Sequence, residues 1–353
     1  MTIPSEAGTE GTSAAPPVID EQAAMWAASL VAPRRRDDAH TVRDLRHEIQ
    51  ADVPDLDAAA RRWSQLGHGL PPTQARVVGR LGWVRINVSS MRGAFAPLRE
   101  KLSGNRALAS RVVGVQIGAL FGLLSTKVLG QFVLPLGGPG GGELLVVGPN
   151  VLELAERHGD LATDIRRTVV LHEITHRLQF DGNPWLGEHL RGLVQRYLAD
   201  ARLDRNAVRE LAPRLPRLIA EVRETGTIEP LLSAVLTEEQ SRIVSQAQGL
   251  MSLLEGHGNT AMYDAAAQDL IRDPQAVRDA LAERHGDVTS KLLSLAGMEM
   301  KRRQYREGEQ FVRGVLELGG VTALNHAFAA PDHLPQADEV ADPAGWLARV
   351  RAA

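Results

Sequence analysis

The chain has 353 residues, with 40 Lys and Arg, 43 Asp and Glu, and a formal net charge of −3. It contains no cysteine, which excludes disulfide frameworks, zinc fingers and cysteine-protease chemistry, so any metal must be held by His, Asp or Glu. Basic and acidic residues are interspersed, and this pattern gives no indication of a nucleic-acid-binding surface.

The first 20 residues are rich in Ser, Gly, Thr, Pro and Ala and contain few large apolar side chains. Such a segment cannot bury enough surface to fold, so residues 1–20 are predicted to be a disordered N-terminal tail. The tail lacks the features of a signal peptide, and we expect a cytoplasmic protein without membrane contacts. Residues 21–353 are predicted to form a single domain, largely helical over 21–130 and metal-binding over 131–350.

Three glycines, Gly114, Gly118 and Gly122, recur every four residues in the apolar stretch 112–124. On a helix they form a smooth ridge that allows a second helix to approach closely. The same pattern can mark a membrane-spanning dimer, but the stretch is too short to cross a bilayer. We therefore expect a helix of the protein core.

Two short β-prone runs, residues 131–135 and 143–147, flank a glycine-rich connection over residues 137–142. This arrangement predicts a β-hairpin, and residues 80–88 are a candidate for a further strand. The rest of the chain has the composition of helices. The predicted fold is therefore mainly α with a small antiparallel β-sheet (α+β), in which the hairpin directly precedes the helix described next.

An HExxH motif occupies residues 172–176, on a predicted helix that ends near residues 181–184. His172 and His176 lie about 40° apart on one face of such a helix, so both imidazoles can reach one metal ion. Glu173 lies about 100° round, within reach of a metal-bound water. The motif predicts a zinc site that activates water, although HExxH also arises by chance in proteins that bind no metal.

A catalytic zinc ion usually takes three protein ligands and leaves the fourth position for water. The metzincin pattern is absent, because Gln179 and Gly182 stand where that pattern has its glycine and its third histidine. The segment 251–259 offers Glu255 and His257 instead, as in the thermolysin-like arrangement.

Residues 237–240 form a capping-box pattern that predicts a helix reaching about residue 268. On this helix Glu255 falls on an apolar face, where a carboxylate is costly to bury unless a cation such as zinc compensates its charge. His257 points the opposite way and is the weaker candidate. Asn259, one turn beyond Glu255, could orient a ligand histidine through a hydrogen bond. The alternative is that Glu255 only pairs with an arginine.

A wider set of residues resembles the zincin-like metallopeptidases of type 2, a family found largely in actinobacteria and associated with hydrolase activity or deazaflavin-cofactor biosynthesis. The resemblance covers most of residues 75–320. It is carried by the HExxH helix through Gln179-Phe180 and by the segments Val128-Leu129-Gly130-Gln131, Pro184-Trp185-Leu186, Leu254-Glu255-Gly256, Arg303-Gln304-Tyr305 and Phe311-Val312.

The resemblance implies a zincin-like fold with one Zn²⁺ per chain. Its ligands would be His172 and His176, with Glu173 as the catalytic carboxylate, and Glu255 is carried over as the third ligand in a gluzincin-like arrangement. Zincins commonly place a strand along the active-site cleft, where its free edge can pair with an extended peptide.

The predicted function is a zinc metallopeptidase acting on a peptide or protein substrate, with Glu173 as the general base. Tyr305 is the first candidate for stabilising the oxyanion, ahead of Tyr263 and Arg302. Two alternatives stay open: a non-catalytic zincin-like binding or assembly protein, and a metal-dependent amidase acting on a non-peptide substrate. A di-iron bundle is disfavoured because no second Glu-x-x-His motif occurs.

Overall fold

The structure is a computed structural model. It describes residues 17–33, 35, 37–99, 105–136, 141–200, 237–264, 270–284 and 299–352, with only the backbone for residues 299–306. The predicted disordered tail overlaps this part of the chain only at residues 17–20. Val18 and Ile19 are buried there, so the packed domain begins a few residues earlier than predicted.

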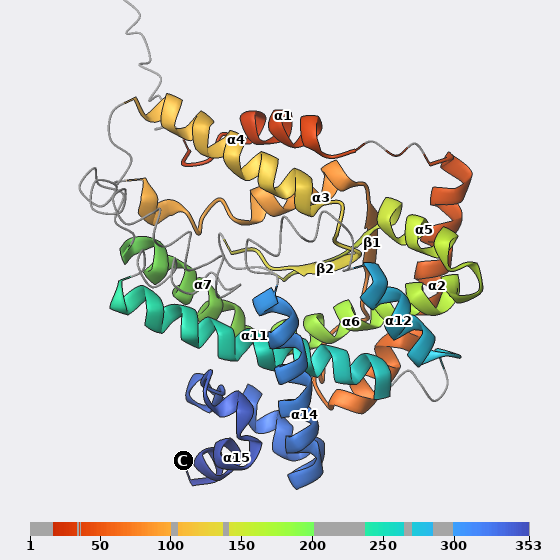
Figure 1. Cartoon of the computed structure of the whole chain (residues 1–353), viewed down its shortest axis with the longest axis vertical. Coiled ribbons are helices and arrows are strands. Elements are labelled where there is room, and N and C mark those ends of the chain that lie inside the picture. The colour runs from red at the N-terminus through yellow and green to blue at the C-terminus, as the bar shows by residue number, and fades with distance from the viewer. Residues whose placement is uncertain are drawn as a thin grey trace, which may run out of the picture.

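A small central sheet separates two layers of helices (Figure 1). One face of the sheet is covered by α1 (Glu21–Val31), α3 (Arg80–Ser90) and α4 (Arg106–Leu124). The other face is covered by a larger core around α2 (Ala39–Ser64) and α6 (Ala162–Gly182). Alternate residues of the strand over residues 143–147 pack into the two cores. Leu145 and Val147 face the first layer, whereas Leu144 and Val146 face the second.

The sheet contains β1 (Ala75–Val78), β2 (Gly130–Val133) and β3 (Glu143–Val147) in the order β1-β3-β2. The antiparallel pairing of β2 with β3 confirms the predicted hairpin, of which residues 137–140 lie outside the described residues. Strand β1 adds in parallel to β3, so the complete sheet is mixed. The candidate strand over residues 80–88 was wrong: it is helix α3, and its buried residues Trp83, Val84 and Val88 recur at helical spacing.

Helix α4 packs its glycine ridge against α1, as the sequence predicted. A Cβ atom added at Gly118 would lie 2.0 Å from the carbonyl oxygen of Ala24, so no larger residue fits there. However, α4 is not a core helix, because its outward side chains such as Leu108 and Leu120 are exposed. It also starts earlier than the predicted stretch. Within the described residues it is the one helix that is long and apolar enough to cross a membrane, judged by length and composition alone.

The other α-helices of the described residues surround the metal-binding half of the chain. They are α5 (Gly148–Arg157), α7 (Pro184–Asp200), α11 (Glu238–Asp264), α12 (Pro274–Arg284), α14 (Glu299–Asn325) and α15 (Pro343–Ala352). Helix α11 begins with the predicted capping box, since Thr237 Oγ1 accepts the Gln240 N–H at 3.0 Å and Gln240 Oε1 accepts the Thr237 N–H at 3.1 Å.

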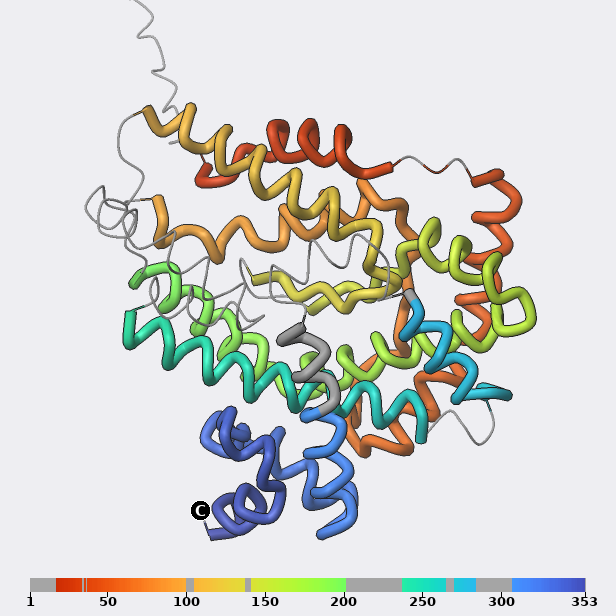
Figure 2. Tube along the Cα trace, in the orientation of Figure 1, coloured from red at the N-terminus to blue at the C-terminus, as the bar shows by residue number. Residues whose placement is uncertain are grey.

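Helices α11 and α14 cross at two glycines. A Cβ atom added at Gly256 would lie 2.2 Å from the backbone of Gly308, so the two backbones are in direct contact. Beyond this crossing the chain continues into a group of C-terminal helices below α11 (Figure 2). The contact fixes the part of α11 that carries Glu255.

Candidate metal centre

Two neighbouring helices bring three potential metal ligands together. His172 and His176 lie on α6, Glu255 lies on α11, and their ligand atoms are all within 4.8 Å of one another. The two Nε2 atoms are 3.0 Å apart, and Glu255 Oε2 is 3.4 Å from His172 Nε2 and 3.8 Å from His176 Nε2. A tetrahedral zinc ion at its usual ligand distances separates its ligand atoms by about 3.3 Å. The three residues therefore fit one ion with little rearrangement.

The cluster is largely shielded but open to solvent. The exposed fractions of the side chains are 16% for His172, 12% for His176 and 15% for Glu255. Water can therefore reach an ion held there, as hydrolytic chemistry requires, while the partial burial strengthens electrostatic interactions in the site.

His257 does not join this group. Its side chain is fully buried and meets the rings of Trp63 and Phe328 edge-on, at centroid distances of 4.9 and 5.3 Å. Burial, with a smaller contribution from the neighbouring His176, lowers the pKa of His257 to about 3, so the ring is neutral. Of the two candidates on α11, the structure groups Glu255 with the histidines of α6.

Gln179 contacts the ring nitrogen of His176 that does not face the other ligands, Nδ1. Its Oε1 lies 2.9 Å from His176 Nδ1, and its Nε2 donates to the Leu254 carbonyl at 3.1 Å and to His257 Nδ1 at 3.0 Å. Because the amide oxygen can only accept, Nδ1 of His176 must carry the proton, which leaves Nε2 as the atom for a metal. The sequence analysis missed this role, although a glutamine three residues after His176 on one helix is within reach of its ring.

The other predicted supporting residues lie as follows. Asn259 is half-buried on α11 and makes no hydrogen bond to either ligand histidine within the described residues. Tyr305 and Arg302 lie on α14, with side chains outside the described residues. The guanidinium carbon of Arg278 lies 3.9 Å from the centroid of the Tyr263 ring. Burial raises the pKa of Tyr263.

Glu173 lies between the metal helix and the edge of the sheet. Its side chain is buried, and its Oε2 accepts the backbone N–H of Phe132 at 2.8 Å. Gly130 on the same strand allows this close approach, because an added Cβ would lie 2.7 Å from Glu173 Cγ. Since β2 pairs with β3 on its other side, its outer edge runs directly past the Glu173 carboxylate.

A second glycine contacts the metal ligands from α11. A Cβ atom added at Gly258 would lie 3.0 Å from Cε1 and 3.1 Å from Nδ1 of His172. The absence of a side chain at Gly258 therefore lets α11 pack tightly against the imidazole and restricts its orientation.

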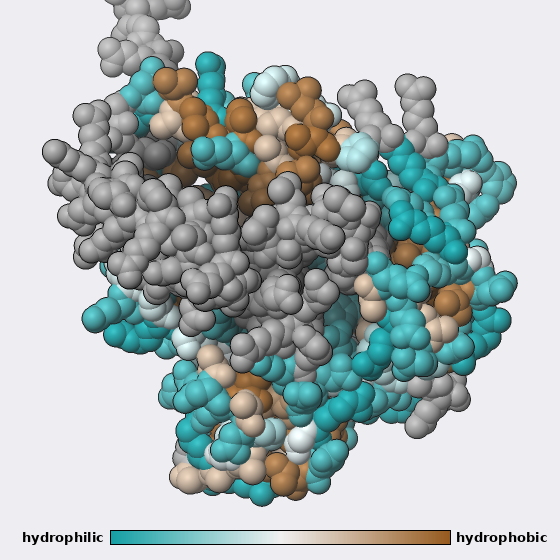
Figure 3. Space-filling model, in the orientation of Figure 1, coloured by the Kyte–Doolittle hydropathy of each residue, from teal (hydrophilic) through white to brown (hydrophobic). Residues whose placement is uncertain are grey.

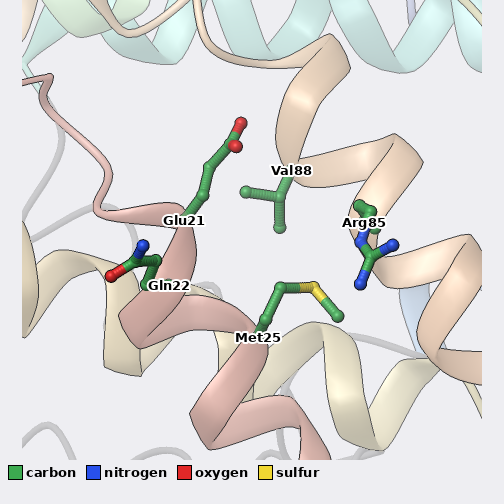
Figure 4. A pocket seen from close by; sticks show the side chains of 5 residues that line it. All are labelled: Glu21, Gln22, Met25, Arg85 and Val88. Atoms are coloured by element: carbon green, nitrogen blue, oxygen red, sulfur yellow. The ribbon is translucent and has the colours of Figure 1, made fainter.

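A cavity of about 280 Å³ lies in the other helical layer, between α1 and α3 (Figure 4). It is lined by Glu21, Gln22, Met25, Arg85 and Val88. None of these residues belongs to the helices that carry the metal cluster, and they do not include a set of metal ligands. The cavity is therefore separate from the metal centre.

A family model described as zincin-like metallopeptidase matches residues 19–347. The chain belongs to the zincin-like metallopeptidase family. Among solved structures, the chain is similar to a protein from Chloroflexus aurantiacus proposed to be a hydrolase with a novel fold. The two share 26% sequence identity over 95% of this chain and 99% of that chain, with a TM-score of 0.67. No protein of curated function matches.

Membership of the zincin-like metallopeptidase family confirms the predicted family, and the structure confirms the mainly α fold class with a small sheet. The donor set also suits a metal of this family. Two imidazoles and one carboxylate are typical ligands of hydrolytic zinc, and no thiolate is available in the chain.

Proposed function

We propose that the protein is a zinc-dependent hydrolase that cleaves peptide bonds. The observation that carries the proposal is the cluster of His172, His176 and Glu255, whose ligand atoms lie within 4.8 Å of one another. Glu173 follows the first of these residues in the sequence, and its carboxylate is buried. Family membership and the similarity to the Chloroflexus aurantiacus protein support hydrolysis as the reaction class.

Each residue of the site has a distinct role in this proposal. His172 and His176 offer neutral imidazole nitrogens, and Glu255 offers a carboxylate that offsets part of the charge of the ion. When bound, zinc supplies a Lewis acid that lowers the pKa of its water toward neutrality. Glu173 takes the proton from the attacking water and delivers it to the leaving amine. The Phe132 N–H holds the Glu173 carboxylate in its orientation.

A peptide substrate is favoured by the position of β2. This strand is at the edge of the sheet, and its outer edge runs past Glu173. Because the Phe132 N–H on this edge already bonds Glu173, an extended peptide that adds here would be held by the other main-chain groups of the strand, which tolerate many side-chain sequences. Its scissile bond would then lie near the general base.

The test combines zinc content with hydrolysis. We expect about one zinc per chain in the wild type, retained in Glu173→Gln and greatly reduced in His172→Ala and Glu255→Ala. His40→Ala is the matched control, because His40 is an exposed histidine that pairs with Asp44 outside the cluster. A peptide-library screen should show cleavage by the wild type and His40→Ala only.

Other results would contradict this proposal. Failure to bind zinc even after reconstitution would rule out the metal site. Stoichiometric zinc without hydrolysis of any peptide, but with cleavage of small amides, would indicate an amidase. Zinc without any hydrolysis, together with wild-type behaviour of Glu173→Gln, would indicate a binding protein.

A further inference from the structure

The layer formed by α1 and α4 has an apolar outer surface. Seven large apolar side chains on these helices are between 37% and 66% exposed: Trp26, Leu30, Leu108, Val112, Val115, Leu120 and Leu123. Brown surface gathers over these two helices at the top of Figure 3. Single exposed apolar residues are ordinary on soluble proteins, but a contiguous patch of several hundred Å² marks an interaction surface.

The packing of the two helices explains why this surface is regular. The glycine ridge of α4 faces inward, with Gly114, Gly118 and Gly122 in contact with the backbone or side chains of α1. The core-facing side of α4 also includes Val113, Ile117 and Phe121, so Leu108, Val112, Val115 and Leu123 are left on its exposed side. Because the inner side is held against α1, α4 lies in the plane of the layer and does not stand free as a spanning segment.

The charge of this part of the chain is strongly asymmetric. Residues 79–142 contain eight Lys and Arg but a single acidic residue, Glu100, in a chain whose formal net charge is −3. Exposed examples among these arginines are Arg85 on α3, Arg99 in the segment between α3 and α4, and Arg106 at the start of α4. Asp20 and Glu21 at the start of α1 pair with Arg111 and Arg92, and the remaining basic residues leave this layer with an excess of positive charge.

We propose that the α1–α4 face docks on an anionic lipid surface. Apolar side chains flanked by arginines are suited to entering the boundary between headgroups and acyl chains, where anionic lipids attract the basic residues. Trp26 provides the amphipathic ring that favours this boundary. A second copy of the chain is a poorer occupant, since a two-fold interface would bring two basic rims together.

The proposed docking face and the metal centre lie on opposite sides of the sheet. The docking face belongs to the layer on one side of the sheet, whereas the ligand residues lie on α6 and α11 on the other side. Membrane docking would therefore leave the metal cluster accessible from the aqueous phase. The proposal departs from the expectation of no membrane contact and does not depend on the proposed hydrolase function.

The test is co-sedimentation of the full chain with vesicles of phosphatidylcholine, alone or with about 30 mol% phosphatidylserine. We expect binding to the anionic vesicles that weakens as salt is added. Val112→Glu should bind them about tenfold more weakly or worse, because it places a charge within the apolar patch. Leu318→Glu is the matched control, since Leu318 is a similarly exposed leucine on α14, outside the patch, and should bind like the wild type.

Circular dichroism confirms that each variant is folded, and Leu123→Glu replaces Val112→Glu if the latter is not. Absence of wild-type binding to anionic vesicles would overturn the proposal. So would equal binding to neutral vesicles, or wild-type binding by both α4 variants. A wild-type dimer in sedimentation that Val112→Glu converts to a monomer would overturn it in favour of a second copy.

Discussion

Gln179 Oε1 accepts a hydrogen bond from His176 Nδ1 at 2.9 Å. The same amide is held in place by the Leu254 carbonyl and by His257, both on α11. Gln179 thus connects the metal helix to the helix that supplies Glu255, and it selects the tautomer of His176 that presents Nε2 to an ion.

Gln179→Leu should weaken zinc binding about 10- to 100-fold, because His176 loses the acceptor that fixes its tautomer. Competition with a chromophoric chelator measures this change. Gln179→Glu keeps an acceptor for His176 Nδ1 but loses the amide donor to the Leu254 carbonyl and His257, so its zinc affinity should fall between those of the wild type and Gln179→Leu. Equal affinities for the wild type and Gln179→Leu would show that the contact does not position the histidine.

Gly258→Ala should weaken zinc binding while the chain stays folded. The new methyl group would lie 3.0 Å from Cε1 of His172, so the imidazole must shift by a few tenths of an ångström away from its present position. Gly192→Ala on α7 is the control, because its nearest neighbour is an Arg196 nitrogen 3.8 Å away. An unchanged zinc affinity in Gly258→Ala would contradict the packing of α11 on His172.

Gly130→Ala should reduce hydrolysis without removing the metal. Its methyl group would meet Glu173 Cγ at 2.7 Å and Val169 Cγ1 at 2.9 Å, and it would displace the general base but none of the ligands. A general base contributes about 10²- to 10⁴-fold to the rate, so we expect kcat to fall about tenfold or more. Kinetics and zinc content are measured on the same sample, with Gly82→Ala, whose nearest atom is 3.6 Å away, as the control. Full activity would indicate that the strand yields instead of the carboxylate.

Gly118→Ala should lower the free energy of unfolding by about 1 to 3 kcal/mol, because the methyl group cannot fit against the Ala24 carbonyl without separating α1 from α4. Urea unfolding measures the effect. Gly159→Ala, where an added Cβ meets nothing within 4 Å, should change the midpoint little. Zinc content should be the same in both variants, since α4 lies across the sheet from the cluster. A wild-type midpoint in Gly118→Ala would mean that the two helices are not in contact.

The sequence by itself determined the features that depend on helical periodicity. His172 and His176 share a face because a helix turns by about 100° per residue, and the same rotation directs Glu255 and His257 to different sides of α11. The capping box at Thr237 was also readable, because its two hydrogen bonds are made within four residues of the chain. The prediction that Glu255 and His257 point to different sides of the helix, with Glu255 as the stronger candidate, therefore agrees with the structure.

Tertiary structure alone decided how these local elements meet. The hydrogen bond from Phe132 to Glu173 joins residues 41 positions apart, and no local pattern specifies it. Glycines such as Gly130 and Gly258 are interpretable only when the opposing side chain is known. Whether an apolar helix is core or surface likewise depends on how many neighbours cover it, and α4 is covered on one side only. Periodicity is a property of the local backbone, whereas the approach of distant segments depends on the packing of the whole chain.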